Sequence, residues 1–297
     1  GYQGGQRWRR RALNQEIAWW WWDGRMPDDW ECVRYKNWQE RGQLEFCNRA
    51  GLQAIYTWRR VEKAVDLRRT AEAMHKEWLQ REAPERLAGF GRLDLRERGD
   101  FQILWDVPSD PAHLLRYLPD QRMLLHWLST DPDPDKVQRL LEPMVASYQR
   151  NDGEHRRWRL LGIAADLPKS FEPVEIQAIP ANVHIAFEGP RHLHLPYRRL
   201  GLAESHLLQN DLFSFYGPLQ KRLWRKVYGR EDLTWRGHEA VRLQIEQRGQ
   251  YALEKLTGRW WRGEALMWHD RPAKRLYALE QVGPKRAKRV ELDHVCP

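Results

Sequence analysis

The sequence is poor in cysteine, and this limits the classes of protein it can belong to. Its 297 residues include only three cysteines, Cys32, Cys47 and Cys296, and no Cys-x-x-Cys pair. A disulfide framework is thereby excluded, and nothing indicates a structural zinc or a thioredoxin-like site. Cys32 and Cys47 are expected on facing positions of one hairpin, where reduced thiols are favoured over a cross-strand disulfide. The expected location is the reducing cytoplasm, although residue 1 is glycine and a leader removed before it is compatible with the sequence.

Long hydrophobic runs are also missing. The longest strongly apolar run near the amino end, 17–22, has six residues. A membrane-spanning helix needs roughly 20 apolar residues, and the core of a signal peptide about 7–15. The sequence therefore predicts no membrane span and shows no targeting segment.

The familiar catalytic motifs are absent too. The chain has no P-loop, no Gly-x-Gly-x-x-Gly after a strand, no Gly-x-Ser-x-Gly elbow and no His-Glu-x-x-His pair. Its scattered carboxylates cannot be assigned as acid and base. We therefore expect a protein that is not an enzyme.

The composition is that of a basic globular protein. Hydrophobic residues make up 41% and charged residues 31%, and 50 Lys and Arg against 41 Asp and Glu give a net charge of +9. Arginine supplies 39 of the 50 basic residues, and tryptophan occurs 17 times. This length suits one large or two ordinary domains, and the charge permits an acidic partner without requiring one.

An internal duplication favours two domains. Met26-Pro27-Asp28-Asp29-Trp30-Glu31 corresponds to Leu167-Pro168-Lys169-Ser170-Phe171-Glu172, 141 residues later. Four further positions match at the same offset: Val33, Tyr35, Leu44 and Phe46 with Val174, Ile176, Ile185 and Phe187. The short polar linker 151–154 then divides the chain into domains 1–152 and 153–297.

Alternation within these segments predicts a strand register. In the first copy it pairs Val33 with Phe46, Tyr35 with Leu44 and Arg34 with Glu45, and the next hairpin pairs Phe46 with Leu52 and Leu44 with Ala54. Transfer by 141 residues predicts these pairs in the second copy: Val174 with Phe187, Ile176 with Ile185, Phe187 with Leu193, and Ile185 with Leu195.

Helical patterns follow the strands. Leu67, Ala71, Met74 and Trp78 recur at helical spacing, and a second pair of helices is expected across 207–227. A closing helix is expected after Asp133, the predicted N-cap. The second copy has no comparable closing helix, because after Gly283 it is polar and basic. We expect its exposed sheet face to be covered by the other domain or by a partner.

The element order in each copy, with a proline and then an aromatic residue at its entry, resembles the PsbP/Mog1/DcrB-like α/β sandwich superfamily. The resemblance covers most of both copies. It implies an α+β fold, two tandem antiparallel β-sheets packed with helices. It also implies an adaptor or assembly role without catalytic residues.

One candidate metal site follows from the register. With Ile185, Phe187, Leu193 and Leu195 facing the core, the opposite face carries His184, Glu188, His192 and His194. Imidazole and carboxylate side chains on neighbouring strands can bind zinc or a similar ion. The alternative is a polar outer face with no cofactor.

Two kinds of interface are also conceivable. In the run Trp19, Trp20, Trp21 and Trp22, an outward-facing pair could anchor a partner, or the chain could bury all four indoles. Basic and aromatic residues interleave at Arg7, Trp8 and Arg9 and at Arg156, Arg157, Trp158 and Arg159. Arginine with tryptophan suits either a protein interface or the phosphates and bases of a nucleic acid.

The sequence as a whole predicts a non-enzymatic adaptor or accessory subunit that docks onto a larger assembly through a Trp- and Arg-rich surface. An RNA- or DNA-binding protein is the first alternative. A metal-dependent enzyme that uses the histidine cluster is the second.

Overall fold

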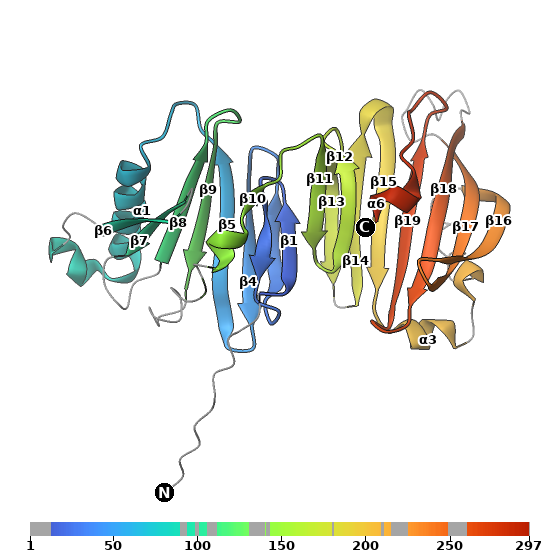
Figure 1. Ribbon diagram of the computed structural model, residues 1–297, viewed down its shortest axis with the longest axis horizontal. Coiled ribbons are helices and arrows are strands. Elements are labelled where there is room, and N and C mark those ends of the chain that lie inside the picture. Colours follow the sequence, from blue (N-terminus) through green and yellow to red (C-terminus); the bar gives the residue numbers. More distant parts are fainter. Residues whose placement is uncertain are drawn as a thin grey trace, which may run out of the picture. The chain divides into compact units, whose positions relative to one another are not determined.

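A computed structural model describes the fold as two compact units, Gly1–Asn151 and Asp152–Pro297 (Figure 1). The residues that the structure describes are 13–89, 94–98, 101–105, 112–130, 140, 143–179, 181–208, 211–214, 225–248 and 260–296.

The first unit contains a hairpin and a seven-stranded antiparallel sheet. The hairpin joins β1 (Gln15–Trp19) to β2 (Trp22–Met26), and β10 (Gln149–Arg150) pairs with β2. The sheet has the order β3-β4-β5-β9-β8-β7-β6. Its strands are β3 (Glu31–Asn37), β4 (Arg41–Asn48), β5 (Gly51–Arg60), β6 (Asp94–Arg98), β7 (Phe101–Trp105), β8 (Ala112–Leu118) and β9 (Met123–Ser129). Between β5 and β6 lie the helix α1 (Leu67–Glu82) and the turn η1 (Pro84–Gly89).

The second unit has the same plan. Its hairpin is β11 (His155–Leu160) with β12 (Ile163–Pro168), and its sheet has the order β13-β14-β15-β19-β18-β17-β16. The strands are β13 (Glu172–Ile179), β14 (Asn182–Gly189), β15 (Leu193–Leu200), β16 (Arg225–Trp235), β17 (His238–Arg248), β18 (Trp260–Asp270) and β19 (Arg275–Gly283). Its short helical elements are η2 (Pro190–His192), α3 (Ala203–Leu207) and α6 (Leu292–Val295). Such a shared topology is the pattern that tandem duplication of one domain produces.

The expected fold class, an α+β sandwich packed with helices, is wrong. The fold is mostly β, with antiparallel sheets and few, short helices. Among the described residues only α1, with 16 residues, is longer than six. Of the two helices expected across 207–227, the first is partly present, because Leu207 ends α3 and 212–214 are helical. The end of the second is wrong, because Val227 belongs to β16, and 215–224 lie outside the described residues. A short apolar run spans too few residues for its periodicity to distinguish a helix from a strand. Of the expected closing helix in the first unit, 131–139 lie outside the described residues and 143–147 are helical.

The predicted pairing of β3 with β4, and of β13 with β14, is confirmed apart from one residue in each unit. Tyr35 pairs with Leu44, and Ile176 pairs with Ile185, as expected. Val33 and Val174 instead fall at β-bulges in β3 and β13 and are more than half exposed. The two matching valines are therefore not core residues, because a bulge leaves its extra residue without a cross-strand partner.

The pairing of β4 with β5, and of β14 with β15, differs from the predicted register by two residues. Phe46 pairs with Ala54 and Phe187 pairs with Leu195, each two positions beyond the expected partner. Because side chains alternate with a period of two, a slip of two residues keeps Ala54, Leu193 and Leu195 on their predicted face. Leu52 is the exception, since a bulge between Phe46 and Cys47 pairs it with Cys47 and leaves it 38% exposed. The inward positions Phe46, Phe187 and Leu195 are buried as expected.

Aromatic side chains fill one face of the first sheet. Trp127 of β9 lies 4.9 Å from Tyr56 and 5.6 Å from Phe46, measured between ring centroids. Trp22, from the hairpin, covers this group at 5.4 Å from Trp127, and Tyr148 lies 4.9 Å from Trp22. The opposite face of the same sheet packs against α1, where Ala71 joins Leu115 and Leu124 in a separate cluster.

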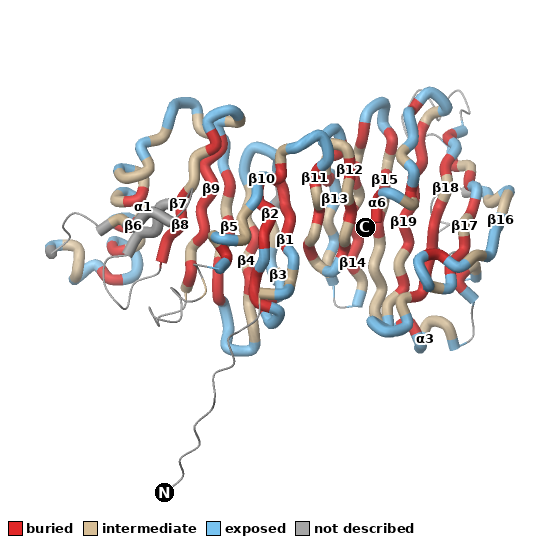
Figure 2. The backbone as a smooth tube through the Cα atoms, in the orientation of Figure 1, coloured by how far each residue is buried: buried red, intermediate tan, exposed pale blue. Residues whose placement is uncertain are grey.

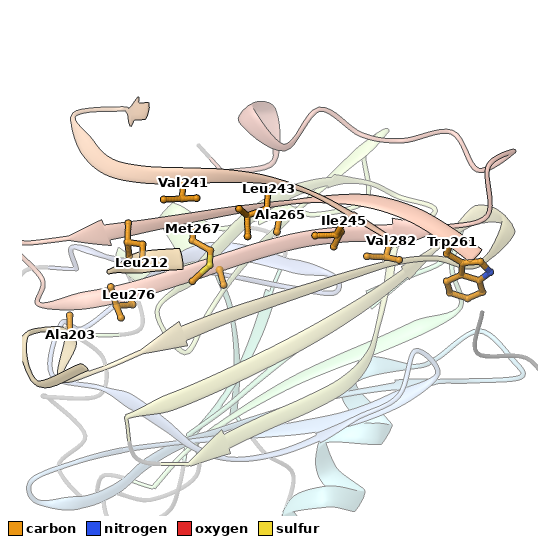
Figure 3. Close-up of a cluster of buried hydrophobic side chains, with 11 residues drawn as sticks. Ala203, Leu212, Val241, Leu243, Ile245, Trp261, Ala265, Met267, Leu276 and Val282 are labelled. Carbon is orange, nitrogen blue, oxygen red and sulfur yellow. The ribbon is translucent and has the colours of Figure 1, made fainter. Parts of the chain in front are cut away.

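The second sheet also has two apolar faces. On one face, strands β17, β18 and β19 contribute most of a cluster that Ala203 and Leu212 complete from outside the sheet (Figure 3). On the other face, Trp158 of the hairpin lies 5.4 Å from Phe187. Figure 2 shows buried positions along the central strands β9, β18 and β19.

The C-terminal segment 284–296 closes this second face. The Gln281 side chain donates to the Val290 carbonyl (2.6 Å) and accepts from the Val290 amide (3.1 Å). Asp293 accepts from the Trp235 indole at 2.8 Å and from Arg242 at 2.7 Å, while Leu292, Val295 and Cys296 are buried. In Figure 1 the segment leaves the end of β19 and returns across the sheet as α6. The second unit therefore has a cover of its own on this face.

Replacing Trp22 by alanine should lower the free energy of unfolding by about 3–5 kcal/mol, because the indole is fully buried among Trp127 and Tyr148. Trp38→Ala is the matched control, since Trp38 is 59% exposed; its loss should cost less than about 1 kcal/mol. Urea unfolding followed by far-UV circular dichroism measures both. Equal effects of the two substitutions would contradict the burial of the tryptophan run.

Replacing Asp293 by alanine should remove about 1–2 kcal/mol of stability, because Trp235 and Arg242 both lose their acceptor. Glu291→Ala is the control, because among the described residues its carboxylate forms an ion pair with the exposed His294 alone; the expected cost is under about 0.5 kcal/mol. Hydrogen exchange of 290–296 together with urea unfolding gives the readout. If Asp293→Ala left both measurements unchanged, the carboxylate would not anchor the segment.

Candidate partner-binding surface

Antiparallel pairing brings several basic residues to one end of the second sheet. At this end β17 finishes beside the start of β18, and β19 finishes beside Arg262 of β18. The turn between β14 and β15 lies at the same end, because Gly189 pairs with Leu193 and His194 with Val282. We call the exposed residues gathered here the basic rim: Arg191, Lys226, Trp260, Arg262, Lys285, Arg286, Lys288 and Arg289.

The backbone that carries the last four of these residues is fixed by hydrogen bonds. The Ala287 amide donates to the Pro284 carbonyl (2.9 Å), and Arg191 Nη1 donates to the Arg286 carbonyl at the same distance. Ala287 itself is buried. The loop is thus held by its main chain and by one buried alanine, while its four basic side chains extend into solvent.

An aromatic side chain lies beside the cations. The Lys226 ammonium is 4.8 Å from the centroid of the Trp260 ring, which is 38% exposed. Arg262 forms an ion pair with Glu246 at 2.9 Å. Exposed cation–π pairs of this kind contribute modestly to stability, so the arrangement is more notable for the mixed aromatic and cationic surface it presents.

Charge is unevenly distributed along the chain. Residues 152–297 hold 25 basic and 18 acidic side chains, whereas 1–151 hold 25 and 23. At the other end of β19 the exposed cations are paired, Arg271 with Glu239 (3.0 Å) and Lys274 with Glu204 (3.6 Å). Within the described ranges, none of the side chains of Lys285, Arg286, Lys288 and Arg289 forms an ion pair. The basic rim therefore carries a local group of four exposed cations that have no acidic partner among the described residues.

The residues proposed as metal ligands lie on the expected face but form pairs. His192 Nδ1 contacts Glu188 at 2.9 Å, and His184 Nδ1 lies 3.7 Å from Glu175. His194 is Glu188's cross-strand partner and stacks on Trp261. In the part of the chain that the structure describes, no three His, Cys, Asp or Glu side chains are grouped so as to hold a metal ion.

Burial also lowers the pKa values of two of these imidazoles, His184 and His194, and so keeps both neutral. It lowers the pKa of His184 to about 4, with the nearby Arg198 acting in the same direction, and it lowers the pKa of His194. The Nε2 atoms of both rings are buried without a hydrogen-bond partner.

The tryptophan run faces inward. Trp19, Trp20, Trp21 and Trp22 are at most 5% exposed, and the run forms the turn of a hairpin with Trp20 at a φ of 52°. The alternative in which the chain buries all four indoles is the one that the structure shows, and no outward pair remains to anchor a partner.

The second Trp and Arg cluster is largely structural. Trp158 is in the core, Arg156 is 7% exposed, and Arg159 binds Asp166 at 2.8 Å. Arg157 is half-buried. Arg7, Trp8 and Arg9 lie outside the described residues. On strand β11, Trp158 packs in the core and Arg159 forms a local ion pair with Asp166. The interleaved pattern of Trp and Arg therefore does not by itself mark an interface.

The cysteines are free thiols. Cys32 and Cys47 lie one pairing position apart on β3 and β4. Burial raises the pKa of Cys32 to about 12 and that of Cys296 to about 11, so both stay protonated. Cys296 donates to Tyr197 Oη at 3.4 Å, and His294 Nδ1 lies 3.0 Å from the Glu291 carboxylate.

Sequence reasoning missed a histidine cluster in the first unit. His113 of β8 and His126 of β9 are buried, and their Nδ1 and Nε2 atoms are 2.9 Å apart. His75 of α1 meets the His113 ring edge-on, with centroids 6.0 Å apart. The three are far apart in sequence, and only the sheet register with the docked helix brings them together. The rim was missed because its side chains come from four separate segments, although the run 284–289 was visibly basic.

No helix in the described ranges is long and apolar enough to span a membrane.

Comparison with known proteins gives structural likenesses without a family. No protein-family model matches the chain, and no curated protein matches it. The Tle4–Tli4 complex contains a similar chain at 11% identity and a TM-score of 0.33, covering 93% of this chain and 87% of that one. The T6SS immunity protein TplEi of Pseudomonas aeruginosa has 13% identity and a TM-score of 0.31 over 92% and 89%. A third structure, PA94 from Pseudomonas aeruginosa, is described as a protein of unknown function and putative regulator; it has 19% identity and a TM-score of 0.23 over 45% and 85%.

These identities and TM-scores are too low for any of the likenesses to carry an argument about function. The resemblance to the PsbP/Mog1/DcrB superfamily stays a prediction that the comparisons do not test.

Proposed function

We propose that the protein is a non-enzymatic binding protein that docks an acidic surface of a partner protein on its basic rim. The observation that carries the proposal is the loop 284–289, whose four exposed cations have no acidic partner in the described structure and whose main chain is fixed. A fixed loop loses little conformational freedom when it binds, so more of the electrostatic attraction remains as affinity.

The state of the titratable side chains supports binding over catalysis. A catalytic cysteine or histidine needs a pKa near the working pH and access to substrate. Here burial raises the pKa of Cys296 to about 11 and lowers the pKa of both His126 and His184 to about 4. These groups are fixed in their uncharged forms inside the units.

A protein partner is favoured over a nucleic acid by the composition of the rim. Proteins that bind single strands present several aromatic rings in a row, one for each stacked base. The exposed aromatic side chain of the rim is Trp260, with Lys226 over its ring, and a second exposed ring, Tyr228, follows Lys226 on β16; two rings do not make a row of stacking platforms. Glu246 and Glu188 at the margin add charges that would repel phosphates. An isolated Trp among cations is instead typical of a protein hot spot.

The double substitution Lys288→Gln with Arg289→Gln should weaken binding of a fluorescein-labelled 16-residue Glu- and Leu-containing peptide by about five- to thirtyfold. Two exposed ion pairs contribute about 0.5–1 kcal/mol each at low salt, and 1.4 kcal/mol corresponds to tenfold. Fluorescence anisotropy in about 50 mM and about 200 mM salt measures the affinity and its salt dependence.

The control is Arg271→Gln with Lys274→Gln, which removes the same charge at the opposite end of β19 and should change the affinity less than twofold. Equal weakening by both pairs would mean that net charge alone attracts the peptide, and the rim would not be the site. A 20-nucleotide single-stranded DNA is tested in parallel. If it bound more tightly than the peptide and lost more affinity with the rim variant, the nucleic-acid alternative would replace the proposal.

A further inference from the structure

The three buried histidines of the first unit form a cluster between a helix and a sheet. His113 and His126 stand side by side on β8 and β9, their rings nearly parallel with centroids 5.1 Å apart. His75 reaches them from α1, and its ring also stacks on Trp78. Residues 1–151 contain no other histidine, so every imidazole of this unit belongs to the interface under α1.

The hydrogen bonds at the pair suit neutral rings. His113 Nδ1 and His126 Nε2 share one proton across 2.9 Å, because a neutral pair has one donor and one acceptor at this contact. His126 Nδ1 faces Thr57 Oγ1 at 3.5 Å, and His113 Nε2 is buried without a partner. Protonation of both rings would place two N–H groups, and two positive charges, against each other.

The surroundings offer little to stabilise a charged ring. From β5, Arg59 adds a positive charge that lowers the pKa of His126, and from β8 the phenol of Tyr117 lies on the same face. From α1, Arg68 and Glu72 lie on the same helical face as His75. The charged groups that act on the pKa values of His113 and His126 are His126 and His75 for the first and Arg59 for the second, and each of them carries positive charge when it is charged.

We propose that this cluster is an acid-operated release for α1: proton uptake by His113 and His126 lifts the helix from β8 and β9 and leaves the remainder of the first unit folded. The helix is the cover of this face only. The opposite face of the same strands is filled by Trp127, Tyr56 and Phe46, and no histidine lies there. Lifting α1 exposes the imidazoles to water without opening the aromatic core.

The pH window follows from the pKa of the pair. Burial lowers the pKa of His126 from 6.5 to about 4, and burial together with His126 and His75 lowers the pKa of His113 well below its usual value. Between pH 6.5 and about 4, the histidines bind protons when α1 is lifted but not when α1 is packed on the sheet. The packing of α1 on β8 and β9 therefore weakens as the pH falls from about 6.5 towards 4. For His126 alone, the release equilibrium shifts by about two orders of magnitude across this range.

Hydrogen exchange of the intact protein tests the proposal. In the wild type, exchange of the 67–82 amides, corrected for intrinsic rates, should rise about hundredfold between about pH 7 and about pH 4.5. The β4, β5 and β9 amides should change much less. The double variant His113→Leu with His126→Leu should show no such rise. His126→Gln, which keeps a hydrogen-bonding side chain, should show a smaller rise and covers the case in which the double variant does not fold.

His155→Gln is the matched control, because His155 is exposed on β11 of the second unit. It should behave as the wild type. The proposal is overturned if α1 exchange in the wild type does not depend on pH, or if the helix and the whole sheet lose protection together. It is also overturned if the histidine variants lose protection in acid as the wild type does.

Discussion

Each seven-stranded sheet has two apolar faces, and the rest of the structure depends on covering both. The alternation of side chains along a strand sends every second residue to the opposite face, and in both sheets the two sets are largely buried along the central strands. In the first unit the hairpin β1–β2 covers one face through Trp22, and α1 covers the other through Ala71. In the second unit the hairpin β11–β12 and α6 cover one face, and Ala203 and Leu212 cover the other.

The candidate surface is a consequence of how the second unit meets this constraint. Its chain has to return over the sheet after β19 to deliver Leu292 and Val295. The return begins with a loop that Arg191 and Ala287 hold in place, so four cations stand at a fixed position on the rim. In the first unit the same requirement, met by α1, encloses three histidines. Both proposals thus concern segments that cover a sheet face. In the second unit the covering C-terminal segment carries the proposed partner-binding rim, and in the first unit the covering helix α1 is the proposed pH-sensitive element.

The sequence predicted most of what depends on alternation. Tyr35 opposite Leu44 and Ile176 opposite Ile185 follow from a period of two, and the slip at Phe46 and Phe187 left the predicted faces correct except at Leu52, which lies beside a further bulge. It could not predict the bulges at Val33 and Val174, because a bulge has no signature in hydrophobicity. The fold class was wrong because a short apolar run suits a strand as well as a helix, as at Val227 of β16. Of the candidate sites, the metal set was placed on the correct face, but side-chain pairing within that set depends on distances that no pattern contains.

The central claim is that an acidic partner binds at the basic rim. Zero-length carbodiimide coupling tests it most directly, because it joins a carboxylate only to an amine in contact with it. Applied to the acidic peptide and the intact protein, with the products located by mass spectrometry, it should mark Lys285 and Lys288, together with Lys226 beside Trp260. Coupling that marked Lys169 and Lys274 as strongly as these three, or that avoided the rim, would contradict the account.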